Sequence, residues 1–394
     1  MTGVRAEEVR KRNLSAVLSS LHTQGRLSRA ELTAQLGLNR STIAALVGDL
    51  VAHGLAREVG ARAARGGAGR PSHVVEPAAE RVCVLAADLG AGHLTVARVG
   101  LGGRVLDRRS GRRSLGGGVE DVTEEVAELC AGMHRAAGPD VRILGIGAAV
   151  PGVVRQSDGL IRSAPNLGWI EVPFGRLLGE ATGMRVDVGN DADAGVLAEH
   201  MRGAAVGYGD VIYLSGEVGV GGGVLVDGRP LSGLGGYAGE VGHLPLGDRS
   251  VRCRCGSYGC WETAVGENAL LVAAGRPPGG GLEAVRDVVR SARSGDPVAV
   301  AALHQVAHWL GIGAGALVNV FNPAIIVFGG ALAEVFRGAA PVVRAALDST
   351  AMAPAAAQVR LAPQALGDDS VLLGAAELAF RRLLDDPLGG AVPK

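Results

Sequence analysis

A chain of 394 residues is long enough for two or three domains, and its formal net charge is zero, so no global basic field attracts nucleic acid. The charge is uneven, however: residues 1–76 hold eleven Arg or Lys and six Asp or Glu, an excess of five positive charges. This asymmetry indicates a nucleic-acid-binding end. Because no apolar run reaches the length of a membrane span and the polar N-terminus has no signal-peptide core, we expect a cytoplasmic protein without a membrane segment.

Three short helices are predicted in the first 54 residues. Apolar residues recur at helical spacing over residues 14–21. Ser28 and Glu31 have the spacing of a capping box at the start of a second helix, which Gly37 ends. Asn39 can cap a third helix, and Gly54 ends it. A helix, a turn with glycine and a helix that starts with small polar residues are typical of a helix-turn-helix.

A basic loop follows these helices. Residues 55–59 and 73–76 can pair as a small hairpin, and the segment between them carries three arginines among glycines. Such a loop is typical of a wing that places Arg in a minor groove or against phosphate. We therefore predict a winged helix-turn-helix over residues 1–76; the alternative is a three-helix interaction module with a disordered basic linker. The predicted DNA contacts are Arg40, Ser41, Thr42 and Ala45 on the third helix and Arg62, Arg65 and Arg70 on the wing.

The pattern changes to alternating strands and helices from residue 81 onward. Apolar strand runs are predicted at 82–87, 143–150, 186–188, 211–214 and 325–328, with helices at 120–134 and 298–320. Asp or a glycine-bearing turn follows several of these strands. This alternation predicts an α/β second domain over residues 77–394.

A cluster of metal-ligand residues lies in the middle of this domain. Cys253, Cys255 and Cys260 fall within eight positions, and His243 precedes them by ten residues. One His and three Cys supply the four ligands of tetrahedral Zn²⁺ and leave no open position, so we predict a structural zinc ion held by the 243–260 loop. The alternatives are a chance cluster or a Cys pair in an oxidising compartment.

Six motifs, in this order along the chain, resemble those of the ROK family (repressors, open reading frames and sugar kinases). They are GIGAAVPG at 145–152, APNLGW at 164–169, NDA at 190–192, AGEVGH at 238–243, CRCGSYGC at 253–260 and NPAIIVFGG at 322–330. The resemblance covers residues 81–382. It implies an α/β actin-like (ribonuclease H-like) sugar-kinase fold, in which two lobes close on a cleft. A winged helix-turn-helix in front is the arrangement of the family's regulator branch.

The resemblance also implies which residues bind a sugar. Carried over motif by motif, they are Asn166, Asp191, Glu240, His243 and Glu262. Carboxylates and amides suit the hydroxyls of a pyranose, each of which is both donor and acceptor. His243 would bind zinc through one ring nitrogen and leave the other for the ligand.

In the kinase branch the residue matching Asp191 is the general base, but the phosphate-binding motifs depart from the kinase pattern here. Kinases carry DxGGT after the first strand, whereas this chain has Asp88-Leu89-Gly90-Ala91-Gly92 without the Thr. Their GTGxGGG loop becomes Glu217-Val218-Gly219-Val220-Gly221-Gly222-Gly223, and a carboxylate near a triphosphate would repel it.

We therefore expect no enzyme activity but a sugar-responsive transcriptional regulator, a repressor of carbohydrate metabolism. Its expected partners are a double-stranded DNA operator, a monosaccharide or sugar-derivative effector and further copies of itself in a homodimer or homotetramer. One alternative is an active ATP-dependent sugar kinase with an appended DNA-binding domain. Another is a DNA-bound scaffold that responds to a protein partner.

Overall fold

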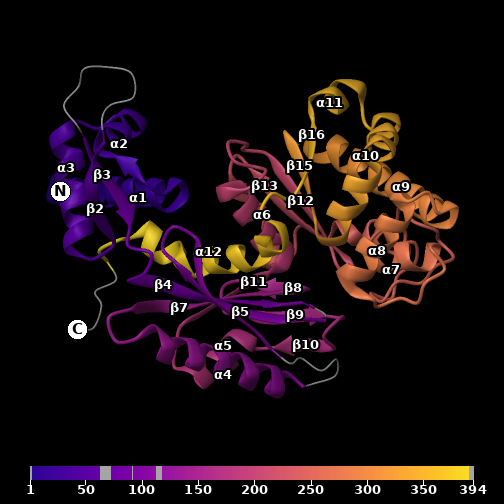
Figure 1. Cartoon of the computed structure of the whole chain (residues 1–394), viewed down its shortest axis with the longest axis horizontal. Helices are drawn as coiled ribbons and strands as arrows, with labels where there is room; N and C mark the ends of the chain where they lie inside the picture. The colour runs from indigo at the N-terminus through magenta and orange to yellow at the C-terminus, as the bar shows by residue number, and fades with distance from the viewer. Residues whose placement is uncertain (1, 63–71, 91, 112–117, 390–394) are drawn as a thin grey trace.

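The N-terminal module is a three-helix winged fold. In the computed structural model, which describes residues 2–62, 72–90, 92–111 and 118–389, three strands pair in the order β1-β3-β2 beside three helices (Figure 1). The Ser28 and Glu31 capping box and the Asn39 cap both form as predicted. The elements are α1 (Thr2–Gln24), β1 (Leu27–Ser28), α2 (Arg29–Leu36), α3 (Arg40–Ala52), β2 (Ala56–Arg62) and β3 (Ser72–Pro77).

The predicted hairpin is confirmed, since β2 and β3 pair antiparallel from Ala56 opposite Pro77 to Arg62 opposite Ser72. Strand β1 was not predicted, because two residues carry no periodicity and this strand exists only through its pairing with β3. Arg65 and Arg70 of the predicted wing lie outside the described residues.

The first lobe of the α/β body is a five-stranded sheet in the order β11-β7-β4-β5-β6. Strands β4, β7 and β11 run parallel, and β5 and β6 continue from β4 as an antiparallel meander. Helices α4 and α5 cover one face, and α12 covers the other. The bounds are β4 (Val82–Leu89), β5 (Leu94–Gly100), β6 (Arg104–Ser110), α4 (Val119–Ala137), β7 (Arg142–Val150), β8 (Val153–Arg155), β9 (Leu160–Ala164), β10 (Trp169–Val172), α5 (Phe174–Thr182), β11 (Val186–Asn190), α6 (Asp191–Arg202) and α12 (Ser370–Asp385).

The second lobe repeats this topology with the order β14-β13-β12-β15-β16. Again three parallel strands, β12, β15 and β16, extend from an antiparallel meander. Two such lobes form the predicted actin-like α/β architecture. The bounds are β12 (Val211–Gly216), β13 (Val220–Val226), β14 (Arg229–Pro230), α7 (Glu267–Ala273), α8 (Gly281–Arg293), α9 (Pro297–Phe321), β15 (Ile325–Gly329), α10 (Gly330–Thr350), α11 (Ala353–Gln358) and β16 (Arg360–Pro363).

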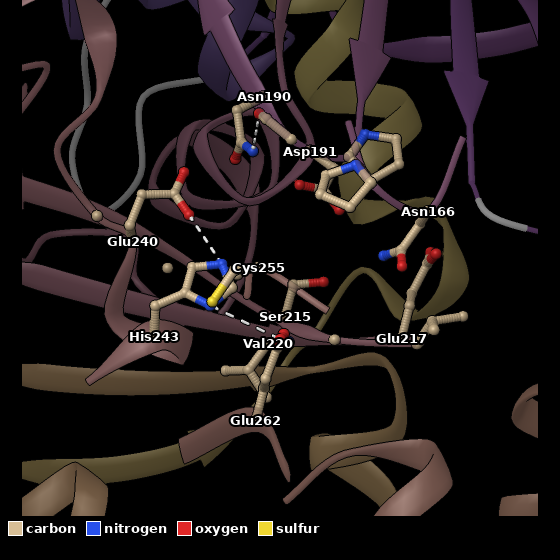
Figure 2. A pocket seen from close by; sticks show the side chains of 18 of the residues that line it. Asn166, Asn190, Asp191, Ser215, Glu217, Val220, Glu240, His243, Cys255 and Glu262 are labelled. Carbon is tan, nitrogen blue, oxygen red and sulfur yellow. Dashed lines mark hydrogen bonds and ion pairs between the residues drawn. The ribbon is translucent and has the colours of Figure 1, made fainter. Parts of the chain in front are cut away.

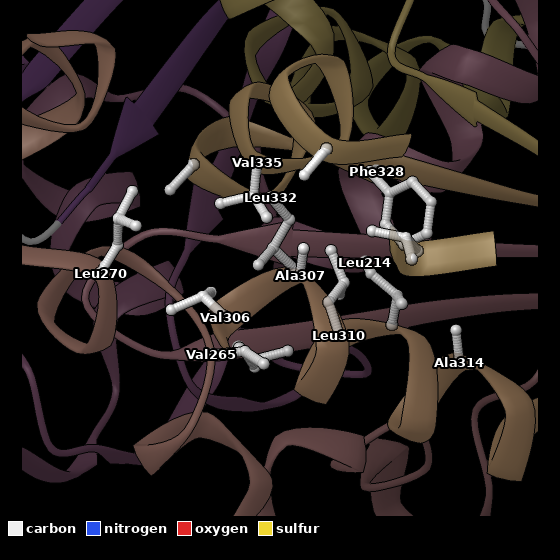
Figure 3. Packing of buried hydrophobic residues seen from close by; sticks show 14 of the residues in the cluster. Leu214, Val265, Leu270, Val306, Ala307, Leu310, Ala314, Phe328, Leu332 and Val335 are labelled. Atoms are coloured by element: carbon white, nitrogen blue, oxygen red, sulfur yellow. The ribbon is translucent and has the colours of Figure 1, made fainter. Parts of the chain in front are cut away.

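Helix α9 is the core helix of the second lobe. Its residues Val306, Ala307, Leu310 and Ala314 pack with Leu332 of α10 and with the strands (Figure 3). The expectation that no segment is long and apolar enough to cross a membrane is wrong for this helix, which meets both criteria by length and composition. However, 56% of its most apolar window is buried inside the protein. The apolar composition of α9 is therefore explained by its burial in the core of the second lobe.

The winged module is joined to the first lobe by a shared hydrophobic core. Leu18 of α1, Val84 of β4 and Phe380 of α12 belong to one cluster of buried side chains. The domain boundary at residue 76 stays a prediction, although the chain leaves β3 at Pro77. This shared core means that a movement of α12 reaches the winged module directly.

A buried polar network crosses the same junction. His22 of α1 lies 2.8 Å from Glu377 of α12, and the backbone N–H of Gly102 donates to its other ring nitrogen. Arg202, the last residue of α6, donates to Glu377 and to the His22 carbonyl, both at 2.6 Å. The side chains of His22 and Glu377 are only 0% and 3% exposed. Three distant segments of the chain, α1, α6 and α12, are thus joined by polar side chains that have little access to water.

Candidate functional site

The candidate site lies where strand ends from both lobes meet. Strand β7 ends at Val150, β11 at Asn190 and β12 at Gly216, and the residues that follow each of them line a cavity of about 110 Å³. In open parallel sheets the carboxyl ends of the strands are the usual ligand edge. All five predicted sugar-binding residues, Asn166, Asp191, Glu240, His243 and Glu262, line this cavity.

Asn190 caps the N-terminus of α6, Asp191 is the first residue of this helix, and both line the cavity. The Asn190 side chain accepts from the N–H groups of Ala192 and Asp193 and donates to the Gly152 carbonyl at 2.8 Å. Strand β13 lies against this first turn, because a Cβ on Gly223 would come within 2.3 Å of the Ala192 carbonyl oxygen. The glycine run of β13 thus lets the second lobe approach the helix end that carries Asp191.

Asp191 is held in an environment that favours its neutral form. Burial is the main cause that raises its pKa well above the usual value, and the nearby charge of Glu217 raises it further. The helix N-terminus opposes this only weakly, being worth at most about 2 kcal/mol. A carboxyl group with a raised pKa can both donate to and accept from a hydroxyl group.

The predicted metal ligands come together. One ligand atom from each of His243, Cys253, Cys255 and Cys260 lies within 4.8 Å of every other. Nδ1 of His243 is 3.8 Å from the Cys253 sulfur, whereas Nε2 faces Glu240 at 3.8 Å. This is the arrangement expected of a histidine that binds a metal with one nitrogen and a ligand with the other. The cluster could therefore hold a tetrahedral metal ion.

Two carboxylates lie on either side of this histidine. Figure 2 shows the His243 ring between Glu240 and Glu262, with Asn166 and Glu217 on the other side of the cavity. Glu262 Oε1 is 2.7 Å from the Cys253 sulfur and 3.6 Å from His243 Nδ1. A Cβ on Gly219 would come within 2.5 Å of Glu262 Oε2, so this glycine leaves the carboxylate its place. The metal cluster and the polar cavity therefore share one wall.

Several lining residues were not predicted. Arg254, between two metal-ligand cysteines, donates from its guanidinium to Asn166 Oδ1 at 3.0 Å, and thereby links the two lobes. Asp193 and Ser215 also line the cavity. A capping motif after a strand could have identified Asn190, but no spacing rule points to Arg254 or Ser215.

Residues 217–223, which depart from the phosphate-loop motif of the kinases, begin at the boundary between the first cavity and a second one. Glu217 and Val218 line both the first cavity and an adjacent one of about 600 Å³, into which Asp88 also faces. Glu217, which stands where the kinase motif has its first glycine, therefore places a carboxylate where the two cavities meet.

The predicted DNA contacts on α3 are available to a partner. Arg40, Ser41 and Ala45 are exposed, Thr42 is partly exposed, and the opposite face of the helix is buried. Arg62 ends β2, but its side chain lies outside the described side chains. The exposed start of α3 is thus a surface with hydroxyls and one cation, free to enter a groove.

Asp193 makes the stability of the site depend on pH. Burial, with a contribution from Glu240, raises its pKa to about 7. Between about pH 4 and pH 7 the folded protein therefore holds a proton that the unfolded chain has released, so the free energy of unfolding falls as the pH rises through this window. We expect Asp193→Asn to remove this decrease and to stabilise the protein by about 1–2 kcal/mol at pH 8, since solvent weakens the full effect.

Urea unfolding at pH 5 and pH 8 measures this change, with Asp140→Asn in an exposed turn as the matched control. An Asp193→Asn protein that loses the same stability between the two pH values as the parent would contradict it.

Together the fold and the site define a class of protein: a winged helix-turn-helix joined to a two-lobed actin-like body that carries a carboxylate-rich cavity beside a four-ligand metal cluster. The chain belongs to the ROK family, whose sequence model matches residues 84–382. It is 27% identical over 384 residues to a xylose repressor of Bacillus subtilis, covering 96% of this chain and 97% of that one.

Solved relatives include both branches of the family. A ROK transcriptional regulator, a homologue of the E. coli Mlc protein, superposes with a TM-score of 0.77 at 26% identity over 96% of this chain and 97% of its own. A ROK glucokinase from Streptomyces griseus, solved with glucose and AMPPNP, superposes with a TM-score of 0.64 at 27% identity, covering 76% of this chain and 99% of its own. The regulator match covers 96% of this chain and therefore includes most of the winged module, whereas the kinase match covers 76% of the chain.

Proposed function

We propose that this protein is a cytoplasmic, sugar-responsive transcriptional repressor. The winged module binds an operator, a homodimer or homotetramer supplies paired half-sites, and a sugar in the first cavity weakens DNA binding. Full-length similarity to a regulator and to a xylose repressor supports this role. We also propose that the metal is zinc, because three Cys and one His in a closed set are its preferred ligands.

The observation that carries the proposal is the path of helix α6. The helix begins at Asp191 in the first cavity and ends at Arg202, which donates to the carbonyl of His22 in the winged module. A twelve-residue helix is about 18 Å long and behaves as a rod. A sugar that shifts the N-terminus of α6 therefore shifts the contact that positions the DNA-binding helices. For a repressor the sugar must favour the arrangement that binds DNA less tightly.

Kinase activity is the second candidate, because Asp191 has the raised pKa of a general base. Glu217 argues against it, since this carboxylate would lie near a transferred phosphoryl group, where phosphoryl transfer needs positive charge. A coupled ADP-release assay with xylose, glucose, N-acetylglucosamine and N-acetylmannosamine distinguishes the candidates. Turnover that Asp191→Asn abolishes would favour the kinase.

The DNA-binding proposal is tested by fluorescence anisotropy with DNA from the promoter region next to the protein's own gene. We expect Arg40→Ala to weaken binding about tenfold, because a base or phosphate contact is worth about 1–3 kcal/mol. Xylose is the first sugar to add, followed by the same panel. Arg176→Ala, an exposed arginine paired with Glu180 in the first lobe, is the control and should bind normally. If the protein did not bind this DNA specifically, either alone or with any sugar of the panel, the proposal would be overturned.

A further inference from the structure

The first cavity is too small for the sugar that the proposed function requires. Its volume is about 110 Å³, whereas an engineered cavity of about 150 Å³ in another protein holds a single benzene molecule. A pyranose has more non-hydrogen atoms than benzene and also needs room for its hydroxyl groups. At least one wall of the cavity must therefore move before a sugar can bind.

Residues 231–239 form the most weakly held wall of this cavity. The segment contributes three residues to the lining, and the side chain of Leu234 is 98% exposed. None of its residues after Leu231 belongs to a buried hydrophobic cluster in the described part of the chain. Other lining residues, such as Asn190 and Ser215, lie on strands of the two sheets. Because segments with few buried apolar contacts open at the lowest free-energy cost, residues 231–239 are the wall expected to move.

The same segment is tied to the first lobe at two points. A Cβ on Gly236 would come within 2.8 Å of the carbonyl oxygen of Val154 in β8, so the two backbones are in direct contact. The hydroxyl group of Tyr237 accepts a hydrogen bond from Nε of Arg162 in β9 at 2.8 Å. Since the segment itself extends from the second lobe, these two contacts close the cavity between the lobes.

Arg162 is held in position by Glu171 of the neighbouring strand β10. Its Nη1 donates to both carboxylate oxygens of Glu171, at 2.6 Å and 2.8 Å. The backbone of Glu171 has a φ of 52°, a left-handed conformation that residues other than glycine rarely adopt. Strained residues of this kind are often found at ligand clamps and switch regions. The strained glutamate, the arginine that it orients and Tyr237 therefore form one chain of contacts across the mouth of the cavity.

We propose that residues 231–239 are a gate over the first cavity, which the hydrogen bond between Arg162 and Tyr237 holds closed, and that a sugar binds only after this gate has opened. This inference rests on the proposed sugar-responsive function and specifies how the effector enters its site. Only the open arrangement has room for a sugar, so the apparent sugar affinity is reduced by the fraction of molecules that are open. A hydrogen bond between exposed side chains stabilises the closed arrangement only modestly, which keeps the open one accessible.

Stopped-flow fluorescence with the full-length protein tests the gate, with xylose first and then the other sugars of the panel, and titration calorimetry gives the equilibrium affinity. We expect Tyr237→Phe, which removes only the accepting hydroxyl group, to raise the association rate constant and the affinity at least about threefold. The dissociation rate constant should stay unchanged, because the contact is already broken when a sugar is bound. Arg162→Ala should have the same effect, and the double variant no more than either single one, since all three lose the same contact.

Tyr208→Phe is the matched control for the loss of a tyrosine hydroxyl group. The Tyr208 hydroxyl accepts from Arg360 at 3.0 Å in the same kind of contact, and neither residue lines the first cavity. This variant should bind and release the sugar at the rates of the parent protein.

An unchanged association rate constant in Tyr237→Phe would overturn the gate. A higher dissociation rate constant would overturn it too, because it would show that the segment closes over a bound sugar instead. In either case, release of the operator by the sugar in the parent protein would still support the sugar-responsive repressor. If no sugar of the panel bound the parent protein or released DNA, both the gate and the proposed function would fail.

Discussion

Cys260→Ser protein is expected to lose the zinc ion that we propose and at least a hundredfold of its affinity for the sugar effector. Cys260 is fully buried in the metal cluster, and Glu262 two residues later lines the sugar cavity. Mutation of a residue that hydrogen-bonds a metal ligand typically costs about 10–100-fold in metal affinity or activity. Loss of a ligand itself should have a larger effect. Without the metal, His243 and the two flanking glutamates lose the anchor that sets their spacing. Metal analysis and titration calorimetry on the same preparation measure both effects.

Cys130→Ser is the matched control, because Cys130 is a buried cysteine of α4 outside the cluster. This variant should keep one zinc per chain and bind the sugar normally. A Cys260→Ser protein with full zinc content, or a zinc-free protein with unchanged sugar affinity, would contradict the role assigned to the metal.

The sequence predicts those features that are set by a few neighbouring residues. The capping box of Ser28 and Glu31, the Asn39 cap and the spacing of the cysteines depend on local geometry, and the structure has each of them. The motifs of a known family add the cavity residues, because they specify positions that tertiary structure later brings together. The five predicted sugar-binding residues do line one cavity, although their binding role stays a prediction.

Features that depend on the packing of distant segments could not be predicted in this way. Arg254 contacts Asn166 across 88 positions and across the gap between lobes. His22 and Glu377 are 355 positions apart, and their contact exists because α12 returns from the second lobe to the sheet of the first. A lone histidine in a helix, or a glutamate among apolar residues near the C-terminus, gives no spacing from which such a pair could be inferred. The apolar helix α9 is similar, since only its packing distinguishes a lobe core from a membrane span.

The second large effect is expected at the junction between the winged module and the body. Burial alone would raise the pKa of Glu377, but His22 and Arg202 outweigh it and hold the pKa below its usual value. Glu377→Ala leaves Arg202, whose side chain is 11% exposed, without its carboxylate partner. Breaking a buried pair from one side typically costs about 3–5 kcal/mol of unfolding free energy. The cost should be full at pH 7, begin to shrink as the pH falls below the unfolded pKa of about 4.3, and vanish only below the lower pKa that Glu377 has in the folded protein.

Glu377→Gln separates stability from signal transmission, because the amide keeps the size and one acceptor of the carboxylate but not its charge. Its sugar affinity should match the parent, since the first cavity lies at the other end of α6, about 18 Å away. The effect of sugar on operator affinity should fall at least fivefold, because Arg202 loses its charged partner on α12 and its hydrogen bond to the His22 carbonyl is less firmly held. Urea unfolding and anisotropy with and without sugar give the two quantities, with Glu180→Ala on the surface of α5 as a control expected to change either by less than about 0.5 kcal/mol. Two results would contradict this prediction: a Glu377→Gln protein that keeps the full sugar response, or a Glu377→Ala protein that loses less than about 1 kcal/mol, well under the usual cost of a broken buried pair. The first would mean that the signal reaches the DNA-binding helices by another path, and the second that the network contributes little to stability.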